Sequence, residues 1–113
     1  MKNTFSYIRR YIRKYSSSVG DNDIRKPLYL IATSGKTCTH IMFWENGNNN
    51  KISNYQYSLD NGKTYRLLDP PQIFSPITIN GLTSGTTYDI VLRGINNNNL
   101  GPPSSAVTVT LIK

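Results

Sequence analysis

The stretch Asn54-Tyr55-Gln56-Tyr57-Ser58-Leu59-Asp60-Asn61-Gly62-Lys63-Thr64-Tyr65 decides the fold of this 113-residue chain. Aromatic and polar residues alternate before the break at Asp60-Asn61-Gly62, which is typical of a strand with one buried face. Asn-Gly favours a tight turn, because both residues tolerate positive φ. The stretch therefore predicts a β-hairpin in the middle of the chain.

The residues from 27 onward repeat this pattern of short apolar or alternating runs separated by Gly, Pro and Asn. We expect an all-β domain, a seven-stranded antiparallel sandwich of the immunoglobulin-like type, with 96–105 as a loop before the last strand. The expected strands are 28–33, 38–44, 52–58, 64–68, 76–82, 87–95 and 106–112.

Residues 1–26 differ from the rest of the chain and hold seven basic and two acidic side chains, a net charge of +5 out of +7. Apolar residues recur at spacings of three and four, and basic residues lie on the other side of the helical wheel. We predict a short basic amphipathic helix or arm that ends in a linker at 20–26, followed by a single domain over 27–113. The residues of the arm that carry this pattern are Phe5, Ile8, Arg9, Arg10, Ile12, Arg13, Lys14, Tyr15 and Val19.

Cellular location is constrained by three features. The single cysteine, Cys38, excludes an internal disulfide and favours a reducing compartment. No stretch approaches the ~20 apolar residues of a membrane span, and Arg9, Arg10, Arg13 and Lys14 interrupt any apolar core of a signal peptide. We expect a virion or intracellular protein without a signal peptide or transmembrane segment.

Several motifs of residues 27–113 resemble those of a fibronectin type III domain. Pro27, Leu30 and Ala32 are similar to its first strand, and Asn54-Tyr55-Gln56-Tyr57 to its third, with Tyr55 at the aromatic position. The most specific match is Ile77, Ile79 and Leu82 followed by Thr83-Ser84-Gly85-Thr86-Thr87-Tyr88. The resemblance implies that Leu82 packs under a turn, that Tyr88 hydrogen-bonds backbone upstream as a tyrosine corner, and that Ile90, Leu92 and Gly94 continue the inward face.

The second expected strand leaves two registers open, because a one-residue slip exchanges its two faces. If Phe43 points inward, Ile41 and Thr39 do too, and His40, Met42 and Trp44 face outward. If Trp44 points inward, Met42 and His40 go with it. We favour the first register, since Ile41 and Phe43 make the better core pair, and it leaves Met42 and Trp44 as an exposed apolar patch.

Catalysis has little support. The chain holds one histidine, His40, and one glutamate, Glu45. His40 and Cys38 share a strand face but lack the orienting acid of a nucleophilic triad. Zinc-ligand spacing, a phosphate loop and a carboxylate pair are also absent from the sequence. We therefore expect no enzyme activity, no catalytic, metal-binding or cofactor-binding residues, no cofactor and no small-molecule substrate.

Binding is the remaining class of function. The arm could dock on a protein, lie on an anionic membrane or contact nucleic acid. It also has features of a transit peptide. The alternative without a binding role is a solvated helix. The Asn clusters 46–50 and 96–99 are expected at one end of the sandwich with 69–71, where amides could bind a carbohydrate or another ligand, although Asn is also simply compatible with turns. The candidate residues outside the arm are Met42, Trp44, Asn48, Asn49, Asn97 and Asn98.

A stand-alone domain of this type, with no secretion signal and a composition rich in Asn, Ile, Lys and Tyr, resembles modules in structural proteins of large DNA viruses and phages. We hypothesise a non-catalytic minor capsid or virion assembly protein whose arm anchors it to neighbouring capsid subunits. The alternatives are a carbohydrate- or ligand-binding domain that uses the Asn-rich loops, and an arm that binds anionic membrane or nucleic acid.

Overall fold

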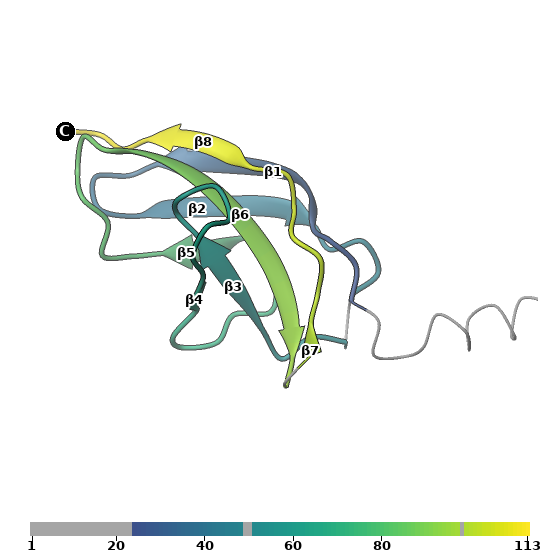
Figure 1. Ribbon diagram of the computed structural model, residues 1–113. Coiled ribbons are helices and arrows are strands. Elements are labelled where there is room, and N and C mark those ends of the chain that lie inside the picture. The colour runs from purple at the N-terminus through teal and green to yellow at the C-terminus, as the bar shows by residue number, and fades with distance from the viewer. Residues whose placement is uncertain (1–23, 49–50, 98) are drawn as a thin grey trace, which may run out of the picture.

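The computed structural model describes residues 24–48, 51–97 and 99–113, which form two antiparallel sheets packed face to face (Figure 1). The first sheet has the order β1-β2-β5, with β1 at Leu28–Ser34, β2 at Thr39–Trp44 and β5 at Ile77–Ile79. The second sheet has the order β4-β3-β6-β7, and β8 also pairs with β6. Its strands are β3 (Asn54–Ser58), β4 (Arg66–Leu67), β6 (Thr87–Asn96), β7 (Asn99–Leu100) and β8 (Val107–Thr110).

The prediction of an all-β sandwich is confirmed, but the end of the second sheet differs from the expected one. A two-residue strand, β7, lies inside the range that we expected to be a loop. Both β7 and β8 pair with β6, β7 at Ile95 and Asn96 and β8 at residues 87–90. Pro102 and Pro103 lie between β7 and β8, and because proline has no N–H to donate, they interrupt the pairing there. The predicted helix of residues 1–26 lies mostly outside the described residues.

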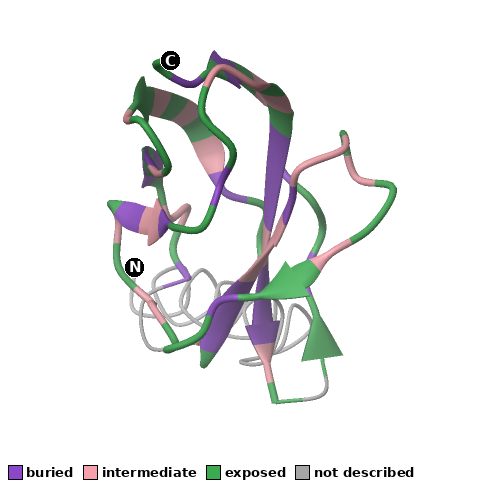
Figure 2. Cartoon of the chain, turned by 90° about the vertical axis from the view of Figure 1, so that its left-hand side faces the viewer, coloured by how far each residue is buried: buried purple, intermediate pink, exposed green. Residues whose placement is uncertain are grey.

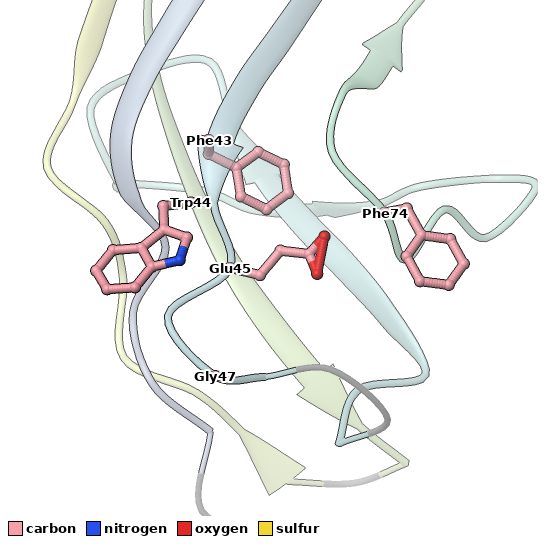
Figure 3. A pocket seen from close by; sticks show the side chains of 5 residues that line it. All are labelled: Phe43, Trp44, Glu45, Gly47 and Phe74. Carbon is pink, nitrogen blue, oxygen red and sulfur yellow. The ribbon is translucent and has the colours of Figure 1, made fainter.

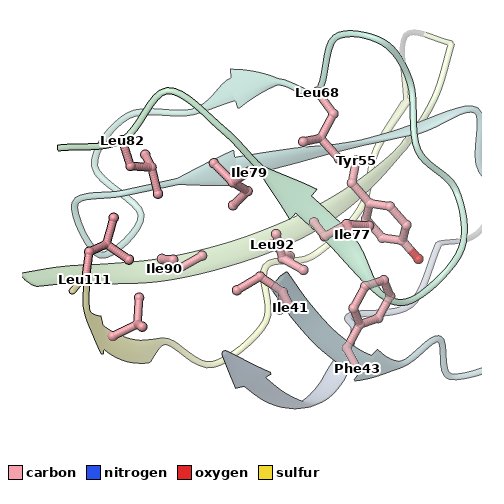
Figure 4. Close-up of a cluster of buried hydrophobic side chains, with 11 residues drawn as sticks. Ile41, Phe43, Tyr55, Leu68, Ile77, Ile79, Leu82, Ile90, Leu92 and Leu111 are labelled. Carbon is pink, nitrogen blue, oxygen red and sulfur yellow. The ribbon is translucent and has the colours of Figure 1, made fainter. Parts of the chain in front are cut away.

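The hydrophobic core fills the space between the sheets, and Figure 2 shows how burial varies along the strands. On β2 the burial alternates strictly: Ile41 is fully buried and Phe43 nearly so, whereas 57% of Trp44 is exposed. The register with Phe43 inward is therefore confirmed. Phe43 meets Tyr55 edge to face, with ring centroids 5.1 Å apart (Figure 4). Around this pair lie Leu68, Ile77, Ile79, Leu82, Ile90, Leu92, Val109 and Leu111.

The tyrosine corner expected at Tyr88 is present. The Thr83 N–H donates a hydrogen bond of 2.9 Å to the Tyr88 hydroxyl oxygen, and this bond lowers the pKa of the phenol. Leu82, next to Thr83, is buried against the core. The corner thus holds the turn before β6 against the strand that follows it.

The central hairpin has the predicted turn, with φ of 61° at Asn61 and 86° at Gly62. Before the turn, the Asp60 carboxylate accepts hydrogen bonds from the hydroxyls of Ser58 and Thr64, both at 2.6 Å, and from the Thr64 N–H at 2.9 Å. These bonds hold the pKa of Asp60 well below its usual range. Because Thr64 is engaged with Asp60, strand pairing resumes at Arg66 and not at Thr64 as expected.

The sandwich begins earlier than the expected boundary at residue 27. Ile24 is buried, and a Cβ added at Gly94 or Gly101 would lie 3.0 or 2.5 Å from its side chain. The two glycines therefore leave the space that Ile24 fills. Residues 24–26, which we assigned to the linker, pack on the sandwich.

Replacing Tyr88 by Phe should lower the free energy of unfolding by about 1 kcal/mol, because the Thr83 N–H loses its acceptor while the ring stays in place. Urea denaturation measures the change. Tyr29→Phe is the matched control, since 74% of Tyr29 is exposed; equal effects of the two substitutions would contradict this role of the corner.

Asp60 should make stability depend on pH in the acidic range. Because its pKa is lower in the folded than in the unfolded protein, its stabilising contribution is complete above the unfolded pKa and is lost as pH falls through the folded pKa. The difference in unfolding free energy between wild type and Asp60→Asn should be constant near neutral pH and shrink below about pH 4. Denaturant titrations across this range measure it, and a difference independent of pH would refute the assignment.

Candidate functional site

Four large apolar side chains are exposed on the outer side of β1 and β2, and we call them the outer apolar face. The face consists of Tyr29, Ile31, Met42 and Trp44, with exposed fractions between 51% and 74%. Met42 and Trp44 are there because their inward neighbours on β2 fill the core. Ile31 is paired with Met42 across the two strands, which makes the face continuous.

Tyr29 joins this face through an unusual backbone conformation. Its φ is 60°, at an irregularity in the pairing of β1 with β2 between Leu28 and Ile31. An aromatic residue in this left-handed region costs roughly 1–2 kcal/mol. The conformation lets the Tyr29 ring stack on Trp44, with centroids 6.2 Å apart and planes 11° apart. The result is a flat aromatic surface that is open to solvent.

A shallow recess of about 400 Å³ adjoins Trp44, where β2 ends, and we call it the Trp44 recess. Figure 3 shows the Glu45 carboxylate between the Trp44 and Phe74 side chains, with Phe43 above it and Gly47 below it in this view. The Ser75 N–H donates a 3.3 Å hydrogen bond to Glu45 Oε1 and so helps to hold the carboxylate in place. Phe74 is 64% exposed, so two accessible aromatic rings flank one acidic group.

The two Asn-rich loops lie at the same end of the sandwich, as expected, since the Asn97 N–H donates to Ser53 Oγ and Asn96 Nδ2 donates to the Lys51 carbonyl. Asn46 is engaged in the same way, with its Nδ2 donating to the Lys26 carbonyl at 3.2 Å. These amides hold backbone together. They are correspondingly less available to a carbohydrate or another ligand.

Asn48 was expected to contact a ligand, and the structure contradicts this. Its side chain is fully buried: Oδ1 accepts the Arg25 N–H at 2.8 Å and Nδ2 donates to the Arg25 carbonyl at 2.6 Å. Its role is to fasten residues 24–26 to the sandwich. Asn97 is exposed, with φ of 55°, whereas Asn49, Asn98 and the candidate residues of the arm lie outside the described part of the chain.

The only histidine and cysteine of the chain form no recognisable site. His40 Nδ1 lies 2.9 Å from Thr78 Oγ1 across β2 and β5, and Cys38 is a half-buried free thiol. Among the described residues, no group of three His, Cys, Asp or Glu side chains is close enough to hold a metal ion. No helix within this part of the chain is long and apolar enough to cross a membrane.

Sequence reasoning identified half of the outer apolar face. Met42 and Trp44 were predicted from the alternation on β2. Tyr29 and Ile31 could have been found by the same argument, since they alternate with Leu30 and Ala32, which match the first strand of the resembled family. Phe74 and Glu45 had no such signal, because they come together only through the folding of distant segments.

Comparison with known proteins identifies the fold. No family model and no curated protein matches the sequence. Solved structures do match, and the fibronectin type III domain of human fibronectin type III domain containing protein 3 superimposes with a TM-score of 0.61 at 17% identity, over 77% of this chain and 84% of that one. This chain has a fibronectin type III fold.

Two further fibronectin type III structures agree. The FN5 domain of Drosophila Lar has a TM-score of 0.61 at 18% identity, over 80% of this chain and 98% of that one. The chicken CNTN1 FN1-FN3 domains match with the same TM-score at 13% identity, over 80% of this chain, which spans only 31% of that three-domain fragment. In this fibronectin type III fold, the Trp44 recess lies at the end of the sandwich that carries the Asn-rich loops.

Replacing Asn48 by Ala should destabilise the domain by about 1–3 kcal/mol, because the Arg25 N–H and carbonyl lose their partners in a partly buried position. Chemical denaturation measures the loss. The control is Asn99→Ala at the same end, where the side chain is exposed and the change should stay within about 0.5 kcal/mol. Equal stabilities of the two variants would contradict the fastening role.

Proposed function

We propose that this protein is a non-catalytic protein-interaction module and that the outer apolar face is its binding surface. The observation that carries the proposal is the stacked, solvent-exposed pair Tyr29 and Trp44 beside the cross-strand pair Ile31 and Met42. Contiguous exposed apolar patches mark interaction sites. Tyr and Trp are also the residues that most often dominate the binding energy of protein interfaces.

The free energy available from burying these four side chains supports the use of the face as a binding surface. Burying one large apolar side chain is worth about 1.5–3 kcal/mol, so four of them could drive association even after the entropic cost of binding is subtracted. The aromatic rings have few rotatable bonds, and the stacking of Tyr29 on Trp44 already restricts them. Little side-chain entropy would therefore be lost on contact with a partner.

In its most specific form, the proposal is a minor capsid or virion assembly protein, located in the virion or inside the cell. The basic amphipathic arm would anchor the protein to neighbouring capsid subunits while the sandwich presents a rigid surface. The sequence of residues 1–26 supports the anchoring role, because its apolar and basic residues separate onto two sides of a helical wheel. Anionic membrane or nucleic acid remain the alternative ligands of the arm, with binding that should weaken steeply with salt.

The proposal predicts that a double substitution on the outer apolar face abolishes partner binding without unfolding the domain. Ile31→Ser with Met42→Ser removes one cross-strand pair from the exposed side of the sheet. Affinity capture from the source material should retrieve a dominant structural protein with the wild type and not with the double variant, and the loss of affinity should exceed about tenfold.

The matched control is Lys36→Ala, an exposed change in the turn between β1 and β2, at the other end of both strands from Trp44. It should bind like the wild type, and urea denaturation should show that all three proteins are folded. Equal capture by the wild type and the folded double variant would rule out this face as the binding surface.

A further inference from the structure

The Trp44 recess has the chemistry of a site for a cationic side chain. Two accessible aromatic rings, Trp44 and Phe74, flank the Glu45 carboxylate (Figure 3). A cation is attracted both by the faces of aromatic rings and by a carboxylate, and a guanidinium can stack on a ring while it donates hydrogen bonds in its plane. Glu45 is also the only glutamate in a chain of net charge +7, so its charge stands out in a basic protein.

We propose that this recess binds an arginine or lysine side chain from the N-terminal arm of a second copy of the same chain. The inference rests on the proposed function and names the partner of the arm. One copy provides the basic segment, and the next copy provides the recess that receives it.

The second sheet contains the same arrangement within one molecule. The Arg93 guanidinium lies over the Tyr65 ring, 3.6 Å from its centroid, and Arg93 Nε donates a 2.7 Å hydrogen bond to Gln56 Oε1. An aromatic ring and one oxygen acceptor thus together contact an arginine side chain in this protein. The Trp44 recess offers two rings and a charged acceptor, and no described arginine or lysine lines it.

An unused polar atom lies close behind the recess. The Tyr55 hydroxyl is buried and has no hydrogen-bond partner among the described residues, and its ring packs on Phe43, which lines the recess. Burial, and then the nearby charge of Glu45, raise the pKa of Tyr55.

The arm has the matching composition. Its basic residues form two pairs, Arg9-Arg10 and Arg13-Lys14, with apolar residues before, between and after them, so a segment that places a cation at Glu45 can also lay apolar side chains on the outer apolar face. Trp44 belongs to both surfaces, which makes the recess and the face one continuous binding area. The same short segment of the arm can thus make the charged contact in the recess and the apolar contacts on the face.

The position of residues 24–26 favours a second copy over the same copy. Ile24 packs on Gly94 of β6 and on Gly101, which follows β7, whereas the recess lies between the end of β2 and Phe74, near the start of β5. The loop 46–48 separates the two places, since Asn48 bonds Arg25 while Gly47 lines the recess. An arm that starts at Ile24 would have to cross this loop to reach its own recess.

The resulting contact is heterologous, because the surface given by one copy differs from the surface used by the next. Heterologous contacts that do not close into a ring produce open chains of subunits. Since a cation and a carboxylate contribute to the contact, association should weaken as salt rises.

The experiment compares full-length proteins by sedimentation velocity over a range of concentrations. Glu45→Gln removes the charge of the recess and nearly keeps its shape, and a fourfold variant with Gln at 9, 10, 13 and 14 removes the cations of the arm. The wild type should self-associate, and each variant alone should do so at least about tenfold more weakly. The control is Asp69→Asn, an exposed carboxylate outside the recess, which should associate like the wild type.

A mixture of the two variants distinguishes a heterologous contact from any other. The Glu45→Gln protein still has an intact arm and the fourfold variant an intact recess, so an equimolar mixture should form a one-to-one dimer that does not grow further. Trp44 is the only tryptophan, so its fluorescence reports directly on this dimer. If the Glu45→Gln protein and the fourfold variant each self-associate on their own as strongly as the wild type, the proposal is overturned, because the interface then lies elsewhere.

A wild type that stays monomeric at all concentrations would also overturn it. If the Trp44 fluorescence of this monomeric wild type differs from that of the fourfold variant, the arm occupies the recess of its own copy. If the two are equal, the recess takes no arm at all. In either case, loss of capture of another structural protein on Ile31→Ser with Met42→Ser would leave the proposed function standing, so the two ideas can fail separately.

Discussion

The packing of Phe43 against Tyr55 is the contact on which the other features of the structure depend. It fixes the register of β2, because a strand alternates its side chains between two faces. With Phe43 and Ile41 in the core, Met42 and Trp44 must be exposed. The same contact therefore creates both the core of the sandwich and the apolar surface that we propose for binding. A change of register that altered one would also alter the other.

The end of the sandwich near Trp44 shows how one segment can serve two purposes. Asn48 and Asn46 bind the backbone of residues 25 and 26, so the point where the arm leaves the domain is firmly held. On its other side, the same loop forms the rim of the Trp44 recess at Gly47. A fixed arm root on one side of this loop and a fixed recess on the other would define the direction in which successive copies could be joined.

The Asn-rich loops illustrate the difference between composition and availability. A run of asparagines is compatible both with ligand binding and with tight turns, and the sequence does not distinguish these uses. In the structure, the side chains of Asn46, Asn48 and Asn96 hydrogen-bond backbone groups of neighbouring segments. Buried backbone groups need such partners, and meeting that need leaves fewer free amides for a ligand.

The sequence by itself determined the all-β class and the turn at Asn61-Gly62, because period-two alternation and turn chemistry are local properties. The resemblance to the fibronectin type III domain implied the corner at Tyr88 and the inward face of β6. The packing of Phe43 against Tyr55 decided between the two registers that the sequence left open for β2. Only the tertiary structure decided that Asn48 is buried, that Ile24 fills the space at Gly94 and Gly101, and that Glu45 lies between Trp44 and Phe74. Each of these depends on segments at least 20 residues apart in the chain. Such contacts arise from the packing of the two sheets and leave no pattern within any single segment.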